Sequence, residues 1–273
     1  MIHDIYPKKI DITYFAQKPS EGDICFVFSG KDSLVKQEKK LNFLKYEDAM
    51  GSIIKSIYLF SIDNQKYFLA DLCDGFLPTG FKFSKVKEHR RLSPKDAVFA
   101  EMTAFHLYTW YTENRYCGRC GALTCVDEAL RMISCPDCHN MIFPKISPAI
   151  IVAVTDGENI LLTKYKGRPY SDFALVAGFI EIGETPEQAA VREVEEEAGV
   201  KIKNLRYYKS QPWGVDSNLL LGYFAELDGS CEITIDETEL SLAEWYPRSQ
   251  IPLQPEDTSL TNEMVQVFKN KLF

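Results

Sequence analysis

Residues 178–200 constrain this chain more than any other stretch, because they join a loop with two glycines to a short and strongly acidic helix. Thr185 is placed to cap this helix, Pro186 suits its first turn, and Gln188 completes a capping box. Gly199 predicts the end of the helix, since glycine turns left-handed without a side-chain clash. These signals predict a helix that begins after Thr185 and ends at Gly199.

The same helix is predicted to separate apolar from acidic side chains. Its inward-facing residues are expected to be Val191, Val194 and Ala198. Glu193, Glu196 and Glu197 have the spacing i, i+3, i+4, so they share another side. Three neighbouring carboxylates repel one another unless a cation lies among them, and all-oxygen ligands suit Mg²⁺ or Mn²⁺. The alternative is a solvated acidic face.

Nine positions in residues 178–200 follow the pattern Gly-x5-Glu-x7-Arg-Glu-U-x-Glu-Glu-x-Gly-U, in which U is bulky and aliphatic. This is the signature of the Nudix hydrolases, and the chain resembles that family. The resemblance implies an α/β fold, namely an α/β/α sandwich with a mixed sheet. It also implies that a catalytic role falls to Glu184, Arg192, Glu193, Glu196 and Glu197.

Composition narrows the class of protein. The chain is 45% hydrophobic and 26% charged, which is typical of a globular protein. A net charge of −8 disfavours general binding to duplex nucleic acid. No apolar run approaches the roughly 20 residues of a membrane span, and the first residues lack the features of a signal peptide. We therefore expect a cytoplasmic protein with no membrane partner.

The order of the patterns predicts four parts. They are a small N-terminal α/β domain (1–92), a linking helix (93–114), a zinc ribbon (115–143) and the domain that contains the acidic helix (144–273). Ser93 and Pro94 are expected to cap and open the linking helix. Among the predicted strands are 57–60, 67–70, 149–154, 160–163, 205–208, 219–224 and 232–235, and a final helix is expected over 258–272.

Four cysteines form two Cys-x-x-Cys pairs, Cys117 with Cys120 and Cys135 with Cys138. Two such turns complete a tetrahedral site of four thiolates, which leaves no open position for chemistry. The pairs therefore predict structural Zn²⁺, with a rubredoxin-like iron site as the alternative. Disulfides are disfavoured in the expected compartment.

Beyond the acidic helix, the chain resembles the NADH pyrophosphatase branch of the Nudix hydrolases. Three features carry this resemblance: the four-cysteine ribbon, the bridge from Phe143 to Pro148, and the run Ser210-Gln211-Pro212-Trp213. The run matches the start of an element that the branch associates with NAD(H) recognition. The chain then departs from the branch, because it reads Gly-Val-Asp-Ser-Asn over 214–218, and Val215 offers no ring to stack on a base.

The resemblance implies further site residues. The carbonyl of Ala177 and the carboxylate of Glu239 are expected to complete the metal shell, although Asp236 and Glu237 are close neighbours of Glu239. The residues expected to contact substrate are Arg90, Phe143, Phe179, Ser210, Gln211, Pro212, Trp213 and Asn218. For Phe179 and Trp213 an ordinary core position is the alternative. Spacing does not decide which glutamate is the general base.

The implied reaction is metal-dependent hydrolysis of the diphosphate bond of NAD(H), which gives NMN(H) and AMP. ADP-ribose, dinucleoside polyphosphates and NAD-capped RNA are alternative substrates, and a homodimer is also implied as an option by the family. A nucleic-acid-binding or regulatory zinc-ribbon protein is the non-enzymatic alternative. The complete acidic motif and the negative net charge disfavour it.

Overall fold

The structure is a computed structural model that describes residues 1–37, 40–167, 173–251 and 258–272. The chain divides into two compact units. We call Ile2–Ile146 with Trp213–Ser217 the N-terminal unit, and Met1, Ser147–Pro212 and Asn218–Phe273 the C-terminal unit. The predicted division into four parts stays a prediction. Among the described residues, no helix is both long and apolar enough to cross a membrane.

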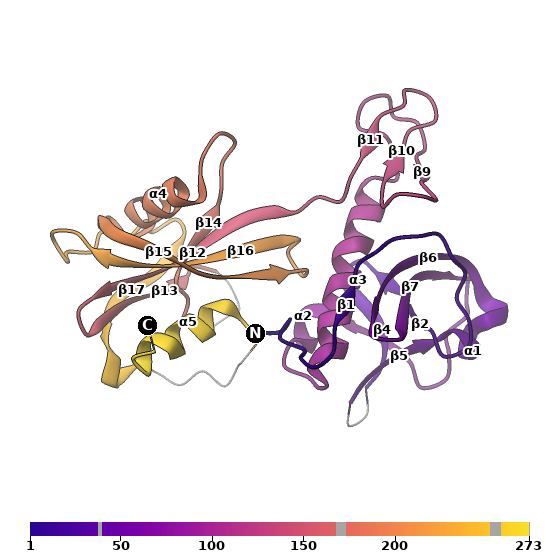
Figure 1. Ribbon diagram of the computed structural model, residues 1–273, viewed down its shortest axis with the longest axis horizontal. Helices are drawn as coiled ribbons and strands as arrows, with labels where there is room; N and C mark the ends of the chain where they lie inside the picture. Colours follow the sequence, from indigo (N-terminus) through magenta and orange to yellow (C-terminus); the bar gives the residue numbers. More distant parts are fainter. Residues whose placement is uncertain (38–39, 168–172, 252–257, 273) are drawn as a thin grey trace. The chain divides into compact units, whose positions relative to one another are not determined.

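The N-terminal unit contains an eight-stranded sheet, in which seven strands follow the order β1-β6-β7-β2-β5-β4-β3 and β8 pairs with β4 (Figure 1). Its strands are β1 (Ile10–Asp11), β2 (Ile24–Phe26), β3 (Phe28–Ser29), β4 (Asp32–Gln37), β5 (Leu41–Lys45), β6 (Ile53–Ile62), β7 (Gln65–Leu72) and β8 (Lys82–Lys85). Strands β6 and β7 pair antiparallel, which confirms the hairpin predicted around 57–60 and 67–70.

The long helix α3 (Lys95–Glu113) packs on this sheet. Phe99, Met102 and Phe105 are buried in the same core as the sheet aromatics Phe26 and Phe60. The remaining helical segments of the unit are α1 (Tyr46–Ala49), η1 (Met50–Ser52) and α2 (Val86–His89).

The predicted start of α3 is wrong in detail. Pro94 is the N-cap residue with an extended backbone, and no side chain caps the helix. Ser93 therefore lies one residue outside the position from which a hydroxyl could accept the first amide N–H groups.

A buried polar network ties α2 to α3. His89 Nδ1 lies 2.9 Å from both carboxylate oxygens of Glu101. His89 Nε2 lies 3.0 Å from the hydroxyl of Ser84 on β8. His89 and Glu101 are both buried, so this network holds the edge strand and two helices together where water cannot replace the hydrogen bonds.

A second, three-stranded sheet of the N-terminal unit follows α3. It has the order β11-β10-β9, with β9 (Cys125–Val126), β10 (Ile133–Ser134) and β11 (Met141–Ile142) all antiparallel. These short strands lie between and beyond the two cysteine pairs.

The C-terminal unit is built on a mixed six-stranded sheet, with the order β15-β16-β12-β13-β17 and β14 paired with β12. Strands β12 and β16 are parallel, whereas β12 pairs antiparallel with both β13 and β14. The strands are β12 (Ser147–Asp156), β13 (Asn159–Tyr165), β14 (Val176–Phe179), β15 (Ile202–Trp213), β16 (Asn218–Leu227) and β17 (Leu240–Pro247).

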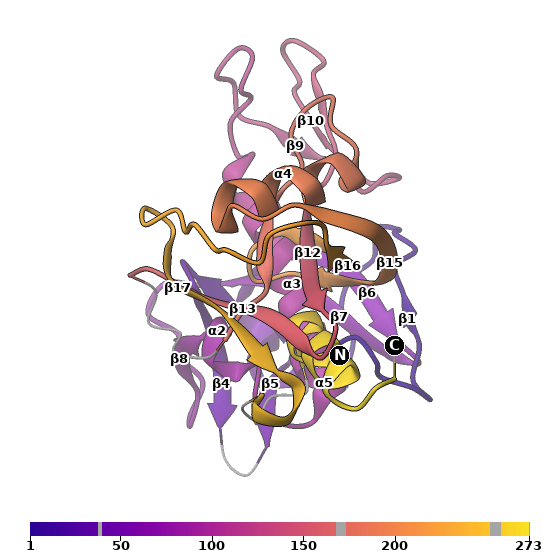
Figure 2. The same cartoon turned by 90° about the vertical axis from the view of Figure 1, so that its left-hand side faces the viewer.

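Helices cover both faces of this sheet (Figure 2). Helix α4 (Pro186–Ala198) packs Ala190 and Val194 on one face, in a cluster with Ile150 and Val152. Helix α5 (Leu260–Lys269) packs Leu260 on the other face. The short turn η2 (Arg248–Gln250) follows β17. The predicted α/β/α sandwich is therefore confirmed, and so is the helix expected within 258–272.

The strand predicted over 232–235 is wrong. This segment has no strand structure, because its backbone bonds to the end of α4 instead of to a neighbouring strand. The amide of Thr234 donates to the carbonyl of Ala198 at 3.0 Å, and the amide of Asp236 donates to the carbonyl of Glu197 at 3.1 Å. The strand that completes the sheet is β17, which the sequence patterns did not reveal.

Candidate active site

Helix α4 begins and ends where the sequence predicts. The Thr185 hydroxyl accepts from the Gln188 amide at 3.2 Å, and the Gln188 side-chain oxygen accepts from the Thr185 amide at 2.9 Å. Gly199 follows the helix with a φ of 69°, in the left-handed region. The capping box and the glycine stop are therefore confirmed.

The buried side of α4 differs from the prediction in several residues. Val194 and Ala198 are buried as expected, but Val191 is 43% exposed. The buried stripe runs through Ala190 instead, and one residue further along turns the side chain outward by about 100°. The same stripe includes Glu197, which is only 3% exposed.

Gly178 and Glu193 make the closest approach between the glycine loop and the helix. A Cβ atom on Gly178 would lie 2.0 Å from the carboxyl carbon of Glu193. Only glycine leaves room for the carboxylate there. The Glu193 side chain is 13% exposed, and burial, as the largest cause, raises its pKa against the opposing effect of Arg192.

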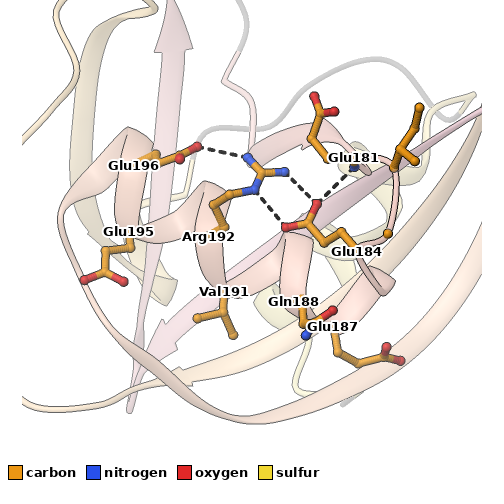
Figure 3. A pocket seen from close by; sticks show the side chains of 10 residues that line it. Glu181, Glu184, Glu187, Gln188, Val191, Arg192, Glu195 and Glu196 are labelled. Atoms are coloured by element: carbon orange, nitrogen blue, oxygen red, sulfur yellow. Dashed lines mark hydrogen bonds and ion pairs between the residues drawn. The ribbon is translucent and has the colours of Figure 1, made fainter.

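Arg192 contacts three of the glutamates, and Figure 3 shows two of these contacts. Its Nε and second terminal nitrogen donate to both oxygens of Glu184, at 2.8 and 2.9 Å. The other terminal nitrogen donates to Glu193 at 2.8 Å and to Glu196 at 2.9 Å. The terminal nitrogen that bonds Glu184 also donates to the carbonyl of Phe179 at 3.1 Å. Arg192 therefore fixes the loop, Glu184 and the helix relative to one another.

The loop over 236–240 brings Glu239 to this site. Its amide donates to the carbonyl of Asp236 at 3.1 Å, and its own carbonyl accepts from the Lys166 amide at 2.8 Å. After burial, the charges of Glu196 and Glu239 also raise the pKa of Glu193. Glu239 therefore lies within electrostatic range of Glu193.

Tyr165 belongs to the same region, although sequence reasoning missed it. Its hydroxyl donates to the carbonyl of Ala177 at 3.3 Å. A tyrosine at the end of an apolar strand carries no distinctive spacing, so only the folded structure relates it to the loop.

The four predicted cysteines come together in the N-terminal unit. Their sulfur atoms all lie within 4.8 Å of one another, with Cys117 and Cys138 at 3.6 Å and Cys120 and Cys135 at 3.4 Å. A disulfide would need about 2.05 Å, whereas thiolates around a Zn²⁺ ion at about 2.3 Å lie several ångströms apart. The four sulfurs therefore fit a tetrahedral metal site.

The two cysteine turns have the same backbone form. The amide of Gly121 donates to the carbonyl of Cys117 at 2.8 Å, and the amide of His139 donates to that of Cys135 at 3.0 Å. Both residues are left-handed, with φ of 78° and 57°. His139 thus occupies the place of a glycine in the turn and is not one of the four clustered side chains that could hold a metal ion.

Comparisons with known proteins find similar sequences and structures for the C-terminal part of the chain. A family profile described as "NUDIX domain" matches residues 145–268. This region of the chain is therefore similar to a NUDIX domain. It is 39% identical over 160 residues to the "NAD-capped RNA hydrolase NudC" of two Escherichia coli strains, O1:K1 / APEC and SMS-3-5 / SECEC. Each alignment covers 59% of this chain and 62% of the relative, so the chain matches less than two thirds of their length.

A solved structure shares the fold of the NUDIX domain. The crystal structure of a NUDIX hydrolase from Nitrosomonas europaea has a TM-score of 0.50 and 21% identity. The match covers 57% of this chain and 92% of that one. This likeness concerns the fold alone.

The Nudix residues fit a hard divalent cation by their chemistry. Glu193 lies in the space that Gly178 leaves open, and Glu239 and the Ala177 carbonyl add oxygen donors in the same unit. In the described part of the chain the four cysteines are the one group of His, Cys, Asp or Glu found gathered for a metal. Glu196 turns instead toward Arg192, and its side chain is 60% exposed.

A hollow of about 1060 Å³ lies on the outer side of the Nudix helix (Figure 3). It is lined by Glu181, Ile182, Gly183, Glu184, Glu187, Gln188, Val191, Arg192, Glu195 and Glu196. Neither Glu193 nor Glu197 lines it. An acidic hollow repels phosphate, so the side of the helix that carries Glu193 and Glu197 is the better location for a diphosphate.

The C-terminal unit places the predicted substrate residues differently. Phe179 is 55% exposed, which excludes the alternative of an ordinary core position. Gln211 is fully buried: its amide nitrogen donates to the carbonyl of Thr258, and its oxygen accepts from the amide of Leu260, both at 2.7 Å. It stabilises the start of α5, which argues against the predicted substrate contact. The remaining residues lie on β15 and β16, with Ser210 and Asn218 half-buried and Pro212 exposed.

The other predicted substrate residues belong to the N-terminal unit. Phe143 is 58% exposed, and Arg90 directly follows α2. Trp213 is half-buried, and its indole N–H donates to the carboxylate of Asp216 at 3.0 Å. Asp216, which belongs to the segment 214–218 where the chain departs from the branch pattern, is therefore a hydrogen-bond acceptor for this tryptophan.

Proposed function

We propose that this chain hydrolyses the diphosphate bond of NAD(H), giving AMP and NMN(H), with Mg²⁺ or Mn²⁺ at the Nudix helix and structural Zn²⁺ at the four cysteines. The approach of Gly178 to Glu193 carries this proposal, because it holds a carboxylate where the loop has no side chain to block it. The complete Nudix motif and the similarity to the Escherichia coli hydrolases support it.

The roles of the side chains follow from their contacts. When bound, a divalent cation would neutralise the diphosphate oxygens and acidify a water. Glu193, Glu197, Glu239 and the Ala177 carbonyl would hold it. Arg192 holds the pKa of Glu184 at about 2, mainly through their side-chain hydrogen bonds. A general base works best with a pKa near the working pH, so Glu184 serves to orient Arg192 and not to accept the proton.

A second candidate substrate is the NAD-capped 5′ end of RNA. The observation that favours it is the name of the relatives, which are NAD-capped RNA hydrolases. The bond that breaks is the same diphosphate bond, so the two candidates differ in what lies beyond the adenosine.

Turnover measurements test the proposal. The purified chain would be assayed with Mg²⁺ or Mn²⁺ against NADH, NAD⁺, ADP-ribose, diadenosine polyphosphates and NAD-capped RNA, with the products identified. We expect AMP and NMN(H) from the first two, and NMN with 5′-phosphorylated RNA from the last. If ADP-ribose or the diadenosine polyphosphates are cleaved fastest, the NAD(H) assignment is wrong.

Two variants serve as controls for this panel. Glu193→Gln and Glu197→Gln keep the size of the side chain but remove its charge, so we expect both to lose metal-dependent hydrolysis and to retain zinc. A double variant with near-full turnover would contradict the assignment of these residues to the cation site.

A further inference from the structure

The contact between Tyr165 and Ala177 links β13 and β14, two strands that each pair with β12 but do not pair with each other. Tyr165 ends β13, Ala177 lies in β14, and the hydroxyl of the tyrosine donates to the alanine carbonyl at 3.3 Å. The next residue is Gly178, whose Cα lies against Glu193. The hydrogen bond therefore acts on the peptide group that leads directly to the carboxylate site.

A β-bulge lies directly before Tyr165 in the pairing of β13 with β17. The pairing of β13 with β17 shifts register between Lys164 and Tyr165. Ser241 is the extra residue of β17 at this shift, and its hydroxyl donates to the Lys164 carbonyl at 3.1 Å. A β-bulge bends its strand and redirects side chains, and bulges are frequent beside active sites. The bulge thus interrupts the regular pairing of β13 with β17 directly before Tyr165.

We propose that Tyr165 is a positioning residue, which holds the Ala177 carbonyl oxygen toward the cation-binding carboxylates. This inference rests on the proposed function, because it assumes a divalent cation at Glu193. A carbonyl oxygen has two lone pairs, so it accepts from the tyrosine with one and keeps the other for the cation. Without the hydroxyl, the peptide between Ala177 and Gly178 loses the bond that orients it.

The decisive measurement is Mn²⁺ binding, because it does not require turnover. Zinc-loaded full-length protein would be titrated with Mn²⁺ and followed by electron paramagnetic resonance. Tyr165→Phe retains the ring and loses the hydroxyl alone. Loss of a residue that orients a metal ligand typically weakens binding by about 10-fold or more, so we expect a rise of about 10-fold in the Mn²⁺ dissociation constant.

The matched control is Tyr6→Phe, since Tyr6 is 91% exposed and belongs to the N-terminal unit. This control should bind Mn²⁺ like the unchanged protein. In hydrolysis, Tyr165→Phe should need more Mn²⁺ for half-maximal activity but recover its kcat at saturating Mn²⁺. A purely structural role would instead lower the unfolding temperature and leave the Mn²⁺ requirement unchanged.

The results separate the two proposals. Unchanged Mn²⁺ affinity in Tyr165→Phe overturns the positioning role, and so does a raised substrate KM with unchanged Mn²⁺ affinity, which would indicate direct substrate contact. Failure of the unchanged protein to bind Mn²⁺ or to cleave any diphosphate overturns the proposed function instead.

Discussion

The Cα atom of Gly178 and the carboxylate of Glu193 touch so closely that a Cβ on the glycine would lie 2.0 Å from the carboxyl carbon. The glutamate is on α4 and the glycine on β14, so the contact relates the two halves of the Nudix motif in space. The requirement for glycine here comes from this approach and not from a left-handed backbone, because Gly178 is not among the residues with positive φ.

Gly178→Ala should displace the Glu193 carboxylate, since a backbone-attached methyl group cannot move aside. A displacement on the order of 1 Å can cost about 100-fold in rate, so we expect kcat/KM for hydrolysis to fall by about that factor. Zinc content should be unchanged. The control is Gly51→Ala, because a Cβ on Gly51 meets nothing within 4 Å. Equal losses in both variants would contradict the steric explanation.

Arg192→Lys should lower turnover although it keeps the positive charge. The guanidinium donates in a fixed planar arrangement to Glu184, Glu193 and Glu196, and a single ammonium cannot reproduce this geometry. We expect a loss of kcat of about 10-fold or more, as for other residues that orient metal ligands. Arg248→Lys is the matched control, because Arg248 pairs with the exposed Glu158 at 2.8 Å. An Arg192→Lys enzyme with full kcat would disprove the orienting role.

The acid titration of Glu184 provides an independent test of the same contact. Its folded-state pKa is about 2, below the ordinary 4.5, because the charged form bonds to Arg192. The ionised Glu184 therefore stabilises the folded state above pH 4.5, and this stabilisation is lost as the pH falls toward 2. Arg192→Lys should move the pKa upward toward its ordinary value. Carboxyl ¹³C NMR between these pH values measures the shift, and an unmoved Glu184 signal would contradict this assignment.

Replacement of one cysteine of the cluster should release zinc. Elemental analysis should find about one Zn²⁺ per chain, as expected for one four-thiolate site. Cys135→Ser should reduce this value and lower the unfolding temperature of the N-terminal unit. Cys125→Ser is the control, because Cys125 is exposed and lies outside the four-sulfur cluster. Iron in place of zinc would favour the rubredoxin-like alternative.

The paired turns of the four-cysteine site predict opposite effects for two substitutions. His139→Gly should strengthen zinc retention by up to about 1 kcal/mol, because glycine adopts a left-handed backbone without strain. Gly121→Ala should weaken it, and the cost comes from the backbone alone, since a Cβ there meets nothing within 4 Å. Competition with a chelator measures both. Changes of the same sign would show that the turns are not equivalent.

Local signals determined the elements whose ends depend on neighbouring residues. Thr185, Gln188 and Gly199 mark the limits of α4 through contacts with residues at most four positions away. The spacing of Cys117, Cys120, Cys135 and Cys138 likewise predicted a four-thiolate site, because each pair binds from a single turn. These features were predictable since their physical cause lies within the stretch that shows the pattern.

Only the tertiary structure decided what depends on contacts between distant residues. Glu197 is buried and Val191 is exposed, contrary to the prediction, because the sheet beneath the helix determines which side of α4 is buried. Gln211 hydrogen-bonds to the start of α5. The segment 232–235 is hydrogen-bonded to the end of α4 and does not form a strand. The sequence thus determined that an acidic Nudix helix exists, whereas packing decided which oxygens face the site, because helix periodicity does not specify what each side meets.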